Sequence, residues 1–337
     1  MNTNWKLLAA VGLLAACNGD KEEESENQFD TYDSGDIVDT NDPTTNEDCE
    51  VVVSSITPES GTTGVYYRTT MEVSFDEDAS SLSPTITLAD PAGTEVGVGV
   101  AFDDTGFKAT VTPTTPLEAL TEYTLTVDIC ESTSAVAFTT SEYGGSLGVD
   151  PSALAGTTYH FSLGDAEYTQ PEGLGALLSS FLDAPLLIGV GEVSGTTINV
   201  LGTQGMDDGG IVPDPSFDVW DFGPATLEGA YFQSSPTDIE LEYGCATIPI
   251  YDFALSGTFA ADASSIGGGS ALGLGDSRHM GCLAGLGTDP DAICNYAATF
   301  GFACEECPDG NPWCLTIEAW FEPAPLLPGV SLEVAAD

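Results

Sequence analysis

The sequence predicts an all-β protein that is built from two folded units and stabilised by disulfides. Short apolar and β-branched runs recur from about residue 50 onward, and glycine, proline and aspartate separate them. The length of 337 residues is more than one small domain needs and fits two folded units and a tether. Nine cysteines are enough for several disulfides in an exported chain.

Residues 1–16 have the order of a signal peptide. Lys6 supplies positive charge, an apolar run follows from residue 7, and the segment ends in Leu14, Ala15, Ala16 and Cys17. The apolar run is only half of the about 20 residues that a membrane span needs. We therefore expect that the chain is exported. The signal peptide is either of the ordinary kind, with no lipid attached after cleavage, or of the lipoprotein kind.

A cysteine directly after Leu-Ala-Ala resembles the lipobox of bacterial lipoproteins. The resemblance implies that Cys17 is acylated, for example with palmitate, and becomes the first residue of the mature chain. By the same resemblance, Asn18 in place of aspartate favours the outer membrane. The expected location is thus outside the cytoplasm, on the membrane through a lipid anchor.

The charge of the chain excludes several classes of partner. Asp and Glu number 54 against 5 Lys and Arg, and cleavage before Cys17 leaves only Lys21, Arg68, Lys108 and Arg278. Such a surface repels phosphate backbones and anionic headgroups, so nucleic acid and nucleotides are not expected partners. The acidity is consistent with adaptation to high salt, with calcium binding, or simply with solubility.

Residues 17–48 are predicted to be a disordered acidic tether. The segment is rich in Asp and Glu and has too few large apolar side chains for a core. As a flexible coil it would span roughly 30 Å. Its aspartates recur at every third position from residue 30 to 42, which does not match the ligand spacing of an EF-hand loop.

Residues 49–141 are predicted to form an antiparallel β-sandwich. Seven candidate strands with turn residues between them occur within this segment. They cover residues 51–56, 71–75, 84–89, 94–102, 107–113, 123–127 and 135–140.

The segments 57–65 (TPESGTTGV), 71–77 (MEVSFDE), 113–127 (PTTPLEALTEYTLTV) and 138–140 (FTT) occur in this order. They resemble the SbsA-type bacterial Ig-like domain of S-layer and surface proteins. The resemblance implies spacing, display or adhesion, and no catalytic residues. Cys49 before the first strand and Cys130 near the end of the sandwich would meet at one end of it. The chain-entropy model gives such a bridge about 4–5 kcal/mol of stabilisation.

Residues 142–149 are expected to be a short glycine-bearing linker, and residues 150–337 a second β-rich domain. This domain is predicted to be a barrel or a sandwich with one or two short helices, at 173–182 and at about 290–301. The candidate strands cover residues 157–163, 186–190, 197–201, 230–232, 239–243, 246–251, 253–260, 270–275 and 315–322.

Six cysteines belong to the second domain: Cys245, Cys282, Cys294, Cys304, Cys307 and Cys314. An even number in an exported chain predicts disulfides, whose connectivity the sequence leaves open. Two alternatives use the same residues. Cys304 and Cys307 with Cys294 and Cys314 would supply four zinc ligands, or Cys304 and Cys307 would form a redox pair.

Other motifs for catalysis are weak. The segment 276–279 (DSRH) holds the residue types of a catalytic triad, but no nucleophile elbow surrounds Ser277, and His160 falls within a strand pattern. Aspartates at 207–208 and 214–221 would offer oxygen ligands to calcium. A glycosidase would need two placed carboxylates and a sugar-stacking face. The aromatic residues available for that face are Trp220, Tyr231, Phe232, Trp313 and Trp320.

The favoured hypothesis is a lipid-anchored surface protein with a structural, adhesive or display role, no catalytic residues, no metal site and no cofactor other than calcium. Its expected partners are the membrane, through the lipid, and a surface protein or glycan. The alternatives are a lipoprotein enzyme that acts on extracellular glycans and a calcium-dependent binding module. A cleft with two carboxylates about 5–10 Å apart beside tryptophans would favour the enzyme.

Overall fold

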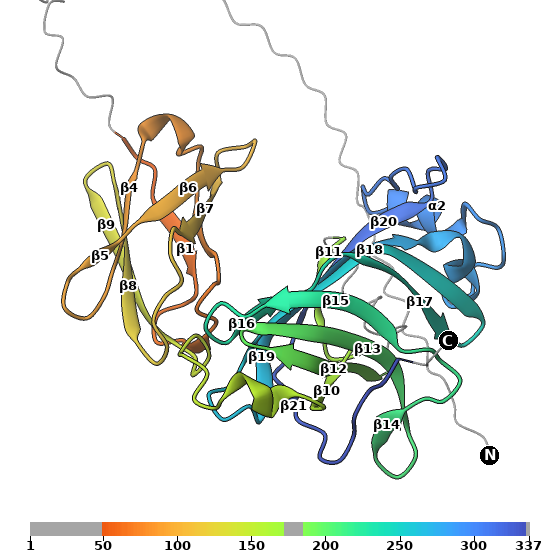
Figure 1. The fold of residues 1–337 in the computed structure, drawn as a ribbon. Coiled ribbons are helices and arrows are strands. Elements are labelled where there is room, and N and C mark those ends of the chain that lie inside the picture. The colour runs from red at the N-terminus through yellow and green to blue at the C-terminus, as the bar shows by residue number, and fades with distance from the viewer. Residues whose placement is uncertain (1–48, 172–184, 335–337) are drawn as a thin grey trace, which may run out of the picture. The chain divides into compact units, whose positions relative to one another are not determined.

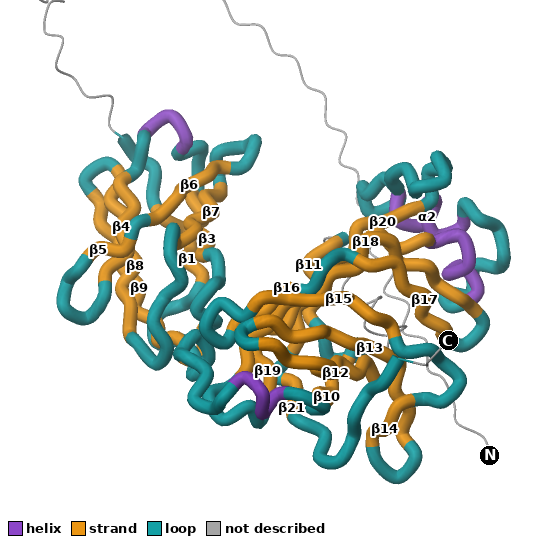
Figure 2. Tube along the Cα trace, in the orientation of Figure 1, coloured by secondary structure: helices purple, strands orange, loops and turns teal. Residues whose placement is uncertain are grey.

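The computed structural model describes residues 49–171 and 185–334 (Figure 1). Strands make up most of this part of the chain and the helical segments are short, as Figure 2 shows, which confirms the all-β prediction. No helix among the described residues is long and apolar enough to cross a membrane. The lipobox, the tether and the helix expected at 173–182 lie outside the described residues.

The first half of the described chain is a sandwich of two sheets. A four-stranded antiparallel sheet has the order β1-β3-β7-β6, and its strands are β1 (Val53–Thr57), β3 (Met71–Phe75), β7 (Lys108–Pro113) and β6 (Val98–Phe102). The second sheet has the order β2-β9-β8-β4-β5. Its strands are β2 (Thr63–Val65), β9 (Ser132–Thr140), β8 (Glu122–Ile129), β4 (Thr85–Ala89) and β5 (Glu95–Val96). Only the pairing of β2 with β9 is parallel in this half.

Alternation along the strands builds the core of this sandwich. In β3 every second side chain, from Met71 to Phe75, is buried, and β8 alternates in the same way. Because successive strand side chains point to opposite faces, one row from each sheet faces the other sheet. Met71, Val73 and Leu125 are fully buried in this shared core.

The second half contains a five-stranded and a seven-stranded sheet. The five-stranded sheet contains β10 (Thr158–Ser162), β12 (Pro185–Ser194), β13 (Thr197–Asp207), β14 (Ile211–Pro213) and β15 (Trp220–Thr226). The seven-stranded sheet has β11 (Glu167–Gln170), β20 (Cys314–Phe321), β19 (Ser265–Asp276), β18 (Ala246–Phe259) and β16 (Tyr231–Gln233) in this order. In the same sheet β17 (Thr237–Tyr243) pairs with β18, and β21 (Ala324–Pro325) pairs with β19.

One apolar core joins these two sheets into a layered β-domain. It includes Tyr159 and Leu186 from the five-stranded sheet and Phe232, Phe259 and Ile266 from the seven-stranded sheet. The longest hairpin of the described chain, β18–β19, turns at residues 260–264. Its turn residue Ala263 has a φ of 61°.

Helical segments are few and short in the described chain. Residues 292–298 form α2 (Ala292–Ala298), inside the predicted 290–301 segment, and Gly301 with a φ of 91° follows it. Three 3₁₀ turns cover Ser80–Leu82, Pro151–Leu154 and Ser277–Cys282. Ile293 and Ala297 are the buried residues of α2 and form its apolar face, whereas Phe300 lies exposed beyond the helix.

Candidate functional site

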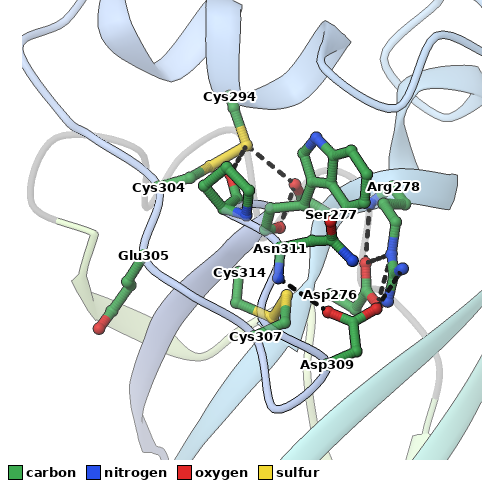
Figure 3. Close-up of a disulfide and its surroundings, with 12 residues drawn as sticks. Asp276, Ser277, Arg278, Cys294, Cys304, Glu305, Cys307, Asp309, Asn311 and Cys314 are labelled. Atoms are coloured by element: carbon green, nitrogen blue, oxygen red, sulfur yellow. Dashed lines mark hydrogen bonds and ion pairs between the residues drawn. A yellow bond between two sulfur atoms is a disulfide. The ribbon is translucent and has the colours of Figure 1, made fainter.

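The eight cysteines considered for disulfides all pair in the structure. The bridges are Cys49–Cys130, Cys245–Cys282, Cys294–Cys304 and Cys307–Cys314. Cys294–Cys304 links α2 to the segment before β20, and Cys307–Cys314 lies at the start of β20 (Figure 3). Cys304 and Cys307 therefore bond to different partners and not to each other. The proposed four-cysteine zinc site and the Cys304–Cys307 redox pair are not formed, because no free thiol remains among these residues.

Asp276 and Arg278 form a buried ion pair beside the bridges (Figure 3). The Asp276 carboxylate is 1% exposed, and the Arg278 Nε donates to both of its oxygens at 2.9 Å. The guanidinium also binds Asp309, with an Nη1 to Oδ2 distance of 2.6 Å. Burial acts to raise the pKa of Asp276, but the hydrogen bonds from Arg278 outweigh it and lower this pKa. This arrangement anchors the loop after β19 and is not a reactive centre.

Ser277 and the histidines do not form a catalytic triad. The Ser277 hydroxyl donates to the backbone carbonyl of Trp313 at 2.6 Å, so its proton is directed at the chain and not at a histidine. Asp276, which a triad would need as the partner of His279, is bound to Arg278. His160 lies in β10, where burial lowers its pKa. Ser277 and Asp276 therefore have structural partners that keep them from acting as triad members.

In the acidic loops that were considered for calcium, aspartate carboxylates accept hydrogen bonds from backbone N–H groups of the same turn. Asp207 accepts from the backbone N–H of Gly210 at 3.1 Å, and Asp214 accepts from that of Ser216 at 2.9 Å. Such contacts are the ordinary turn chemistry of aspartate. Within the described ranges no group of three or more His, Cys, Asp or Glu side chains could hold a metal ion. Calcium binding stays a prediction.

The five aromatic residues considered for a sugar-stacking face have separate surroundings. Phe232 is buried in the core, and Trp220 packs against Phe222. The Trp313 Nε1 donates to Asp291 at 2.6 Å. Tyr231 lies under the guanidinium of Arg68, and Trp320 contacts the ring of Tyr66. Only the last two belong to the region where the first and second halves of the described chain meet.

Three consecutive glycines in β19 receive aromatic rings at close range. A Cβ atom on Gly267 would lie 2.2 Å from the ring of Tyr143, and one on Gly268 would lie 2.1 Å from the ring of Tyr66. A Cβ atom on Gly269 would lie 2.4 Å from Phe161. Tyr66 and Tyr143 come from the first half of the described chain and its predicted linker. The triglycine segment is therefore a docking face, because any side chain there would displace the rings.

Hydrogen bonds hold the docked rings in place. The hydroxyls of Tyr66 and Tyr67 lie 2.8 and 3.1 Å from Oγ1 of Thr258, which is fully buried in β18. The Tyr143 hydroxyl lies 2.9 Å from Oγ of Ser265. Burial raises the pKa of the Tyr66 phenol far above its ordinary value, so the ring stays neutral.

Arg68 extends this contact next to the two tyrosines. Its guanidinium carbon lies 3.9 Å from the ring centroid of Tyr231, and an ion pair of 3.2 Å joins it to Glu228. Its Nε donates to the Tyr67 hydroxyl at 3.1 Å. One of the few cations of the chain thus links β15–β16 of the second half to the segment after β2.

A cleft of about 650 Å³ opens beside the docked rings. Its aromatic walls are Tyr66, Tyr143 and Trp320. Four carboxylates line it as well: Glu142, Asp165, Glu167 and Glu322. Glu167 is the cross-strand neighbour of Trp320 in the pairing of β11 with β20. No lysine, arginine or histidine is part of this lining.

Reasoning from the sequence missed this cleft, although part of its signal was visible. Gly267, Gly268 and Gly269 do not have the spacing of a phosphate loop. Three glycines inside a strand indicate a close approach of other atoms to the backbone. The segment Tyr66-Tyr67-Arg68 is a second signal, since large aromatic residues and arginine are enriched in interfaces.

Comparison with known proteins supports the first half of the fold. A family model described as a bacterial Ig-like domain matches residues 48–140, which confirms the Ig-like resemblance of this segment. The match covers less than half of the chain and gives no family for the second domain. No curated protein matches the chain.

Solved structures show only distant likenesses. The Lin-41 filamin domain is 22% identical with a TM-score of 0.20, over 25% of this chain and 89% of that one. The N-terminal part of the bacterial S-layer protein SbsC is 12% identical with a TM-score of 0.26, over 51% of this chain and 43% of that one. An L,D-transpeptidase from Mycobacterium smegmatis is 18% identical with a TM-score of 0.22, over 54% of this chain and 78% of that one. No function follows from likenesses of this size.

Proposed function

We propose that the chain is a non-enzymatic bacterial surface protein, held on the outer membrane by a lipid on Cys17, with a structural, adhesive or display role. The bacterial Ig-like domain at residues 48–140 supports a role at the cell surface. The lipobox residues Leu14, Ala15 and Ala16 before Cys17 support the anchor. Since basic residues are so few, the lipid would be the means of attachment.

The observation that carries the structural role is the docking of the Ig-like domain onto the triglycine segment. Tyr66 and Tyr143 pack their rings against Gly268 and Gly267, and both hydroxyls are hydrogen-bonded. Domains that are joined only by a linker are expected to move relative to each other. In this chain the packed rings, with their hydroxyls hydrogen-bonded, hold the two domains together as one unit instead. Such a unit suits a protein that presents a binding surface at a fixed position above the membrane.

The residues that were considered for a catalytic triad or a redox thiol pair form structural bonds instead, which supports a non-enzymatic role over a triad hydrolase or a thiol enzyme. Asp276 is bound by Arg278, and Ser277 by the carbonyl of Trp313. The cysteines of the second half are in disulfides.

The anchor is tested by the Cys17→Ser variant. We expect the variant to appear in the soluble extracytoplasmic fraction, because serine cannot form the thioether to which the lipid is attached. The wild-type protein should partition with outer-membrane vesicles and incorporate a palmitate analogue. Asn18→Gln is the matched control, since it changes the neighbouring residue and keeps the thiol.

An Asn18→Asp variant tests whether the protein is sorted to the outer or to the inner membrane. If the outer-membrane assignment is right, this variant should shift to the inner membrane and still carry the lipid. A Cys17→Ser protein that stays in the membrane fraction after export would contradict the proposed anchor.

A further inference from the structure

We infer that the aromatic cleft beside the triglycine segment binds an organic cation, through an alkylammonium or guanidinium group. The cleft has a volume of about 650 Å³, which falls in the range of about 300–1,000 Å³ that ligand pockets occupy. It lies between two packed β-domains, a common position for such sites. The inference goes beyond the proposed surface role and does not depend on the lipid anchor.

The aromatic walls of the cleft are fixed before any ligand arrives. Tyr66 is held through its hydroxyl by Thr258 and packs edge-on against Trp320, with ring centroids 6.3 Å apart. Tyr143 is 7% exposed and is held by Ser265. Because these rings are immobilised by packing and hydrogen bonds, a ligand would lose little binding energy to ordering them. Tryptophan and tyrosine faces attract cations.

The carboxylates of the cleft select the charge of the ligand. Glu142, Asp165, Glu167 and Glu322 form no ion pair within the described part of the chain, where the ion pairs involve Arg68, Lys108 and Arg278. Ionised carboxylates only accept hydrogen bonds, whereas ammonium and guanidinium groups only donate them. An acceptor-rich wall without basic residues therefore complements such a cation in both charge and hydrogen bonding.

Two other classes of ligand fit the cleft less well. A neutral sugar presents hydroxyls that both donate and accept, and hydroxyls of the lining such as those of Thr63 and Thr139 could donate to some of them, but a neutral ligand would leave the four carboxylate charges uncompensated. An inorganic divalent cation needs several oxygen ligands around one point, and the described residues contain no such group. Neither of these ligands would use the aromatic walls together with the uncompensated charge.

The test is calorimetric titration of the purified full-length exported protein in detergent at about 0.15 M salt, which screens weak surface attraction. Spermidine and a short lysine-containing peptide are the two probes, and they distinguish a free polyamine from a protein side chain as the source of the cation. The acetylated form of the peptide and a neutral oligosaccharide are the matched negative probes.

The decisive variant is Glu167→Gln with Glu322→Gln. Both side chains are exposed, so folding should not change, and the cleft loses two charges. We expect the Kd of the better probe to rise by about tenfold or more, which corresponds to about 1.4 kcal/mol. The double change Glu240→Gln with Glu242→Gln on β17 is the control, because it removes the same charge from exposed positions outside the cleft. It should change Kd by less than about twofold, as expected for a screened distant charge.

A second variant tests the aromatic wall. Trp320→Phe keeps a ring in place and weakens the cation–π contact, so Kd should rise by about threefold, with Trp220→Phe as the unaffected control. Equal losses in the cleft and control variants would overturn the site, since the attraction would then be general. The same holds if neither probe binds at millimolar concentration. Variant-sensitive binding of the neutral oligosaccharide would overturn the cation assignment. Failure of this test leaves the proposed surface role standing.

Discussion

Gly268 shows how one residue without a side chain determines the contact between the two folded halves. Its φ of +56° lies in the left-handed region, and the ring of Tyr66 occupies the place of a Cβ atom. A side chain there would have both a backbone cost and a steric cost. These two costs can be measured separately, because the chain contains other glycines with a similar φ in open surroundings.

Gly268→Ala should lower the free energy of unfolding by about 2–5 kcal/mol, since a left-handed φ costs about 1–2 and overpacking about 1–3 kcal/mol. Gly209→Ala is the matched control. Gly209 has a φ of +77° with no atom within 4 Å of the added Cβ, so only the backbone cost remains. Denaturant unfolding measures both variants. Equal losses would show that Tyr66 does not depend on the flat surface of Gly268.

Asp276 predicts a pH dependence of stability. Its pKa in the folded state is lowered, chiefly because Arg278 overcomes the opposing effect of burial. A carboxyl with a depressed folded pKa stabilises the protein above its unfolded pKa of about 4, and this contribution is lost as the pH falls through the folded value. The pair should therefore contribute fully at pH 7.

Asp276→Asn should cost about 3 kcal/mol at pH 7, because it leaves Arg278 with one carboxylate less in a buried site. The difference from the wild type should begin to shrink below about pH 4, where the carboxyl of the unfolded wild-type chain becomes protonated, and should shrink further as the pH falls through the lowered folded pKa. Asp309→Asn is the control, since Asp309 is 40% exposed and its loss should matter less. Thermal melts from pH 3 to 7 measure the difference, and a gap that is constant over this range would contradict the role of the ion pair.

At the scale of elements, the disulfides differ mainly in the length of chain that they close. Cys49 and Cys130 are 81 residues apart, whereas Cys307 and Cys314 are 7 apart. In the chain-entropy model a longer loop gives a larger stabilisation, because it removes more freedom from the unfolded chain.

Replacing both Cys49 and Cys130 by alanine should cost about 4–5 kcal/mol, against about 2–3 kcal/mol for Cys307 and Cys314. Urea unfolding of the two double variants gives the comparison under identical conditions. The opposite order would show that the short bridge acts through packing in the native state, since Cys307 and Cys314 are both buried.

The predictability of the elements follows from their periodicity. Residues 71–75 alternate cleanly and form β3 with these bounds, and residues 239–243 fall within β17. By contrast, β15 was missed because Gly223 and Pro224 interrupt its pattern. Proline is tolerated there because, among the described residues, β15 pairs with β13 alone and lies at an edge. Alternation of apolar and polar residues identifies strands that bury one face, and it does not identify an edge strand whose pattern glycine and proline interrupt.

The connectivity of the cysteines and the cleft could not be predicted in the same way. Six thiols allow about 15 pairings, and only the fold brings Cys294 next to Cys304. The cleft combines Tyr66, Glu167 and Trp320, which are distant in the sequence. Composition identified tryptophans and carboxylates as candidates, but it could not separate the few that share a surface from the many that do not.

At the scale of the whole molecule, the docking contacts couple the Ig-like domain to the second domain. The described residues 49–171 and 185–334 belong to one compact unit, Cys49–Asp337. Tyr143, in the segment that was expected to be a linker, is buried in the core of the first half together with Ala260 from the second. The second domain thus contributes a side chain to the core of the first half.

Calorimetry of the wild-type protein should give a single unfolding transition, because neither half can unfold without exposing Tyr66 and Tyr143. Gly268→Leu should split the single unfolding transition into two, since the larger side chain would displace the rings from the triglycine segment. Gly209→Leu should keep one transition. Two transitions already in the wild type would show that the halves unfold independently and that the docking is weak.

The ion-paired arginines have a consequence for survival outside the cell. Trypsin-like proteases cut after lysine or arginine, and no such residue occurs between Lys108 and Arg278 or after Arg278. In the described chain Arg68 and Arg278 have side chains that are only 29% and 24% exposed, and carboxylates hold both. Lys108 is therefore the most accessible target there, and it lies within strand β7, where the backbone is fixed in a sheet. The second domain therefore offers such a protease a single cleavage site, after Arg278, whose side chain is held by two carboxylates.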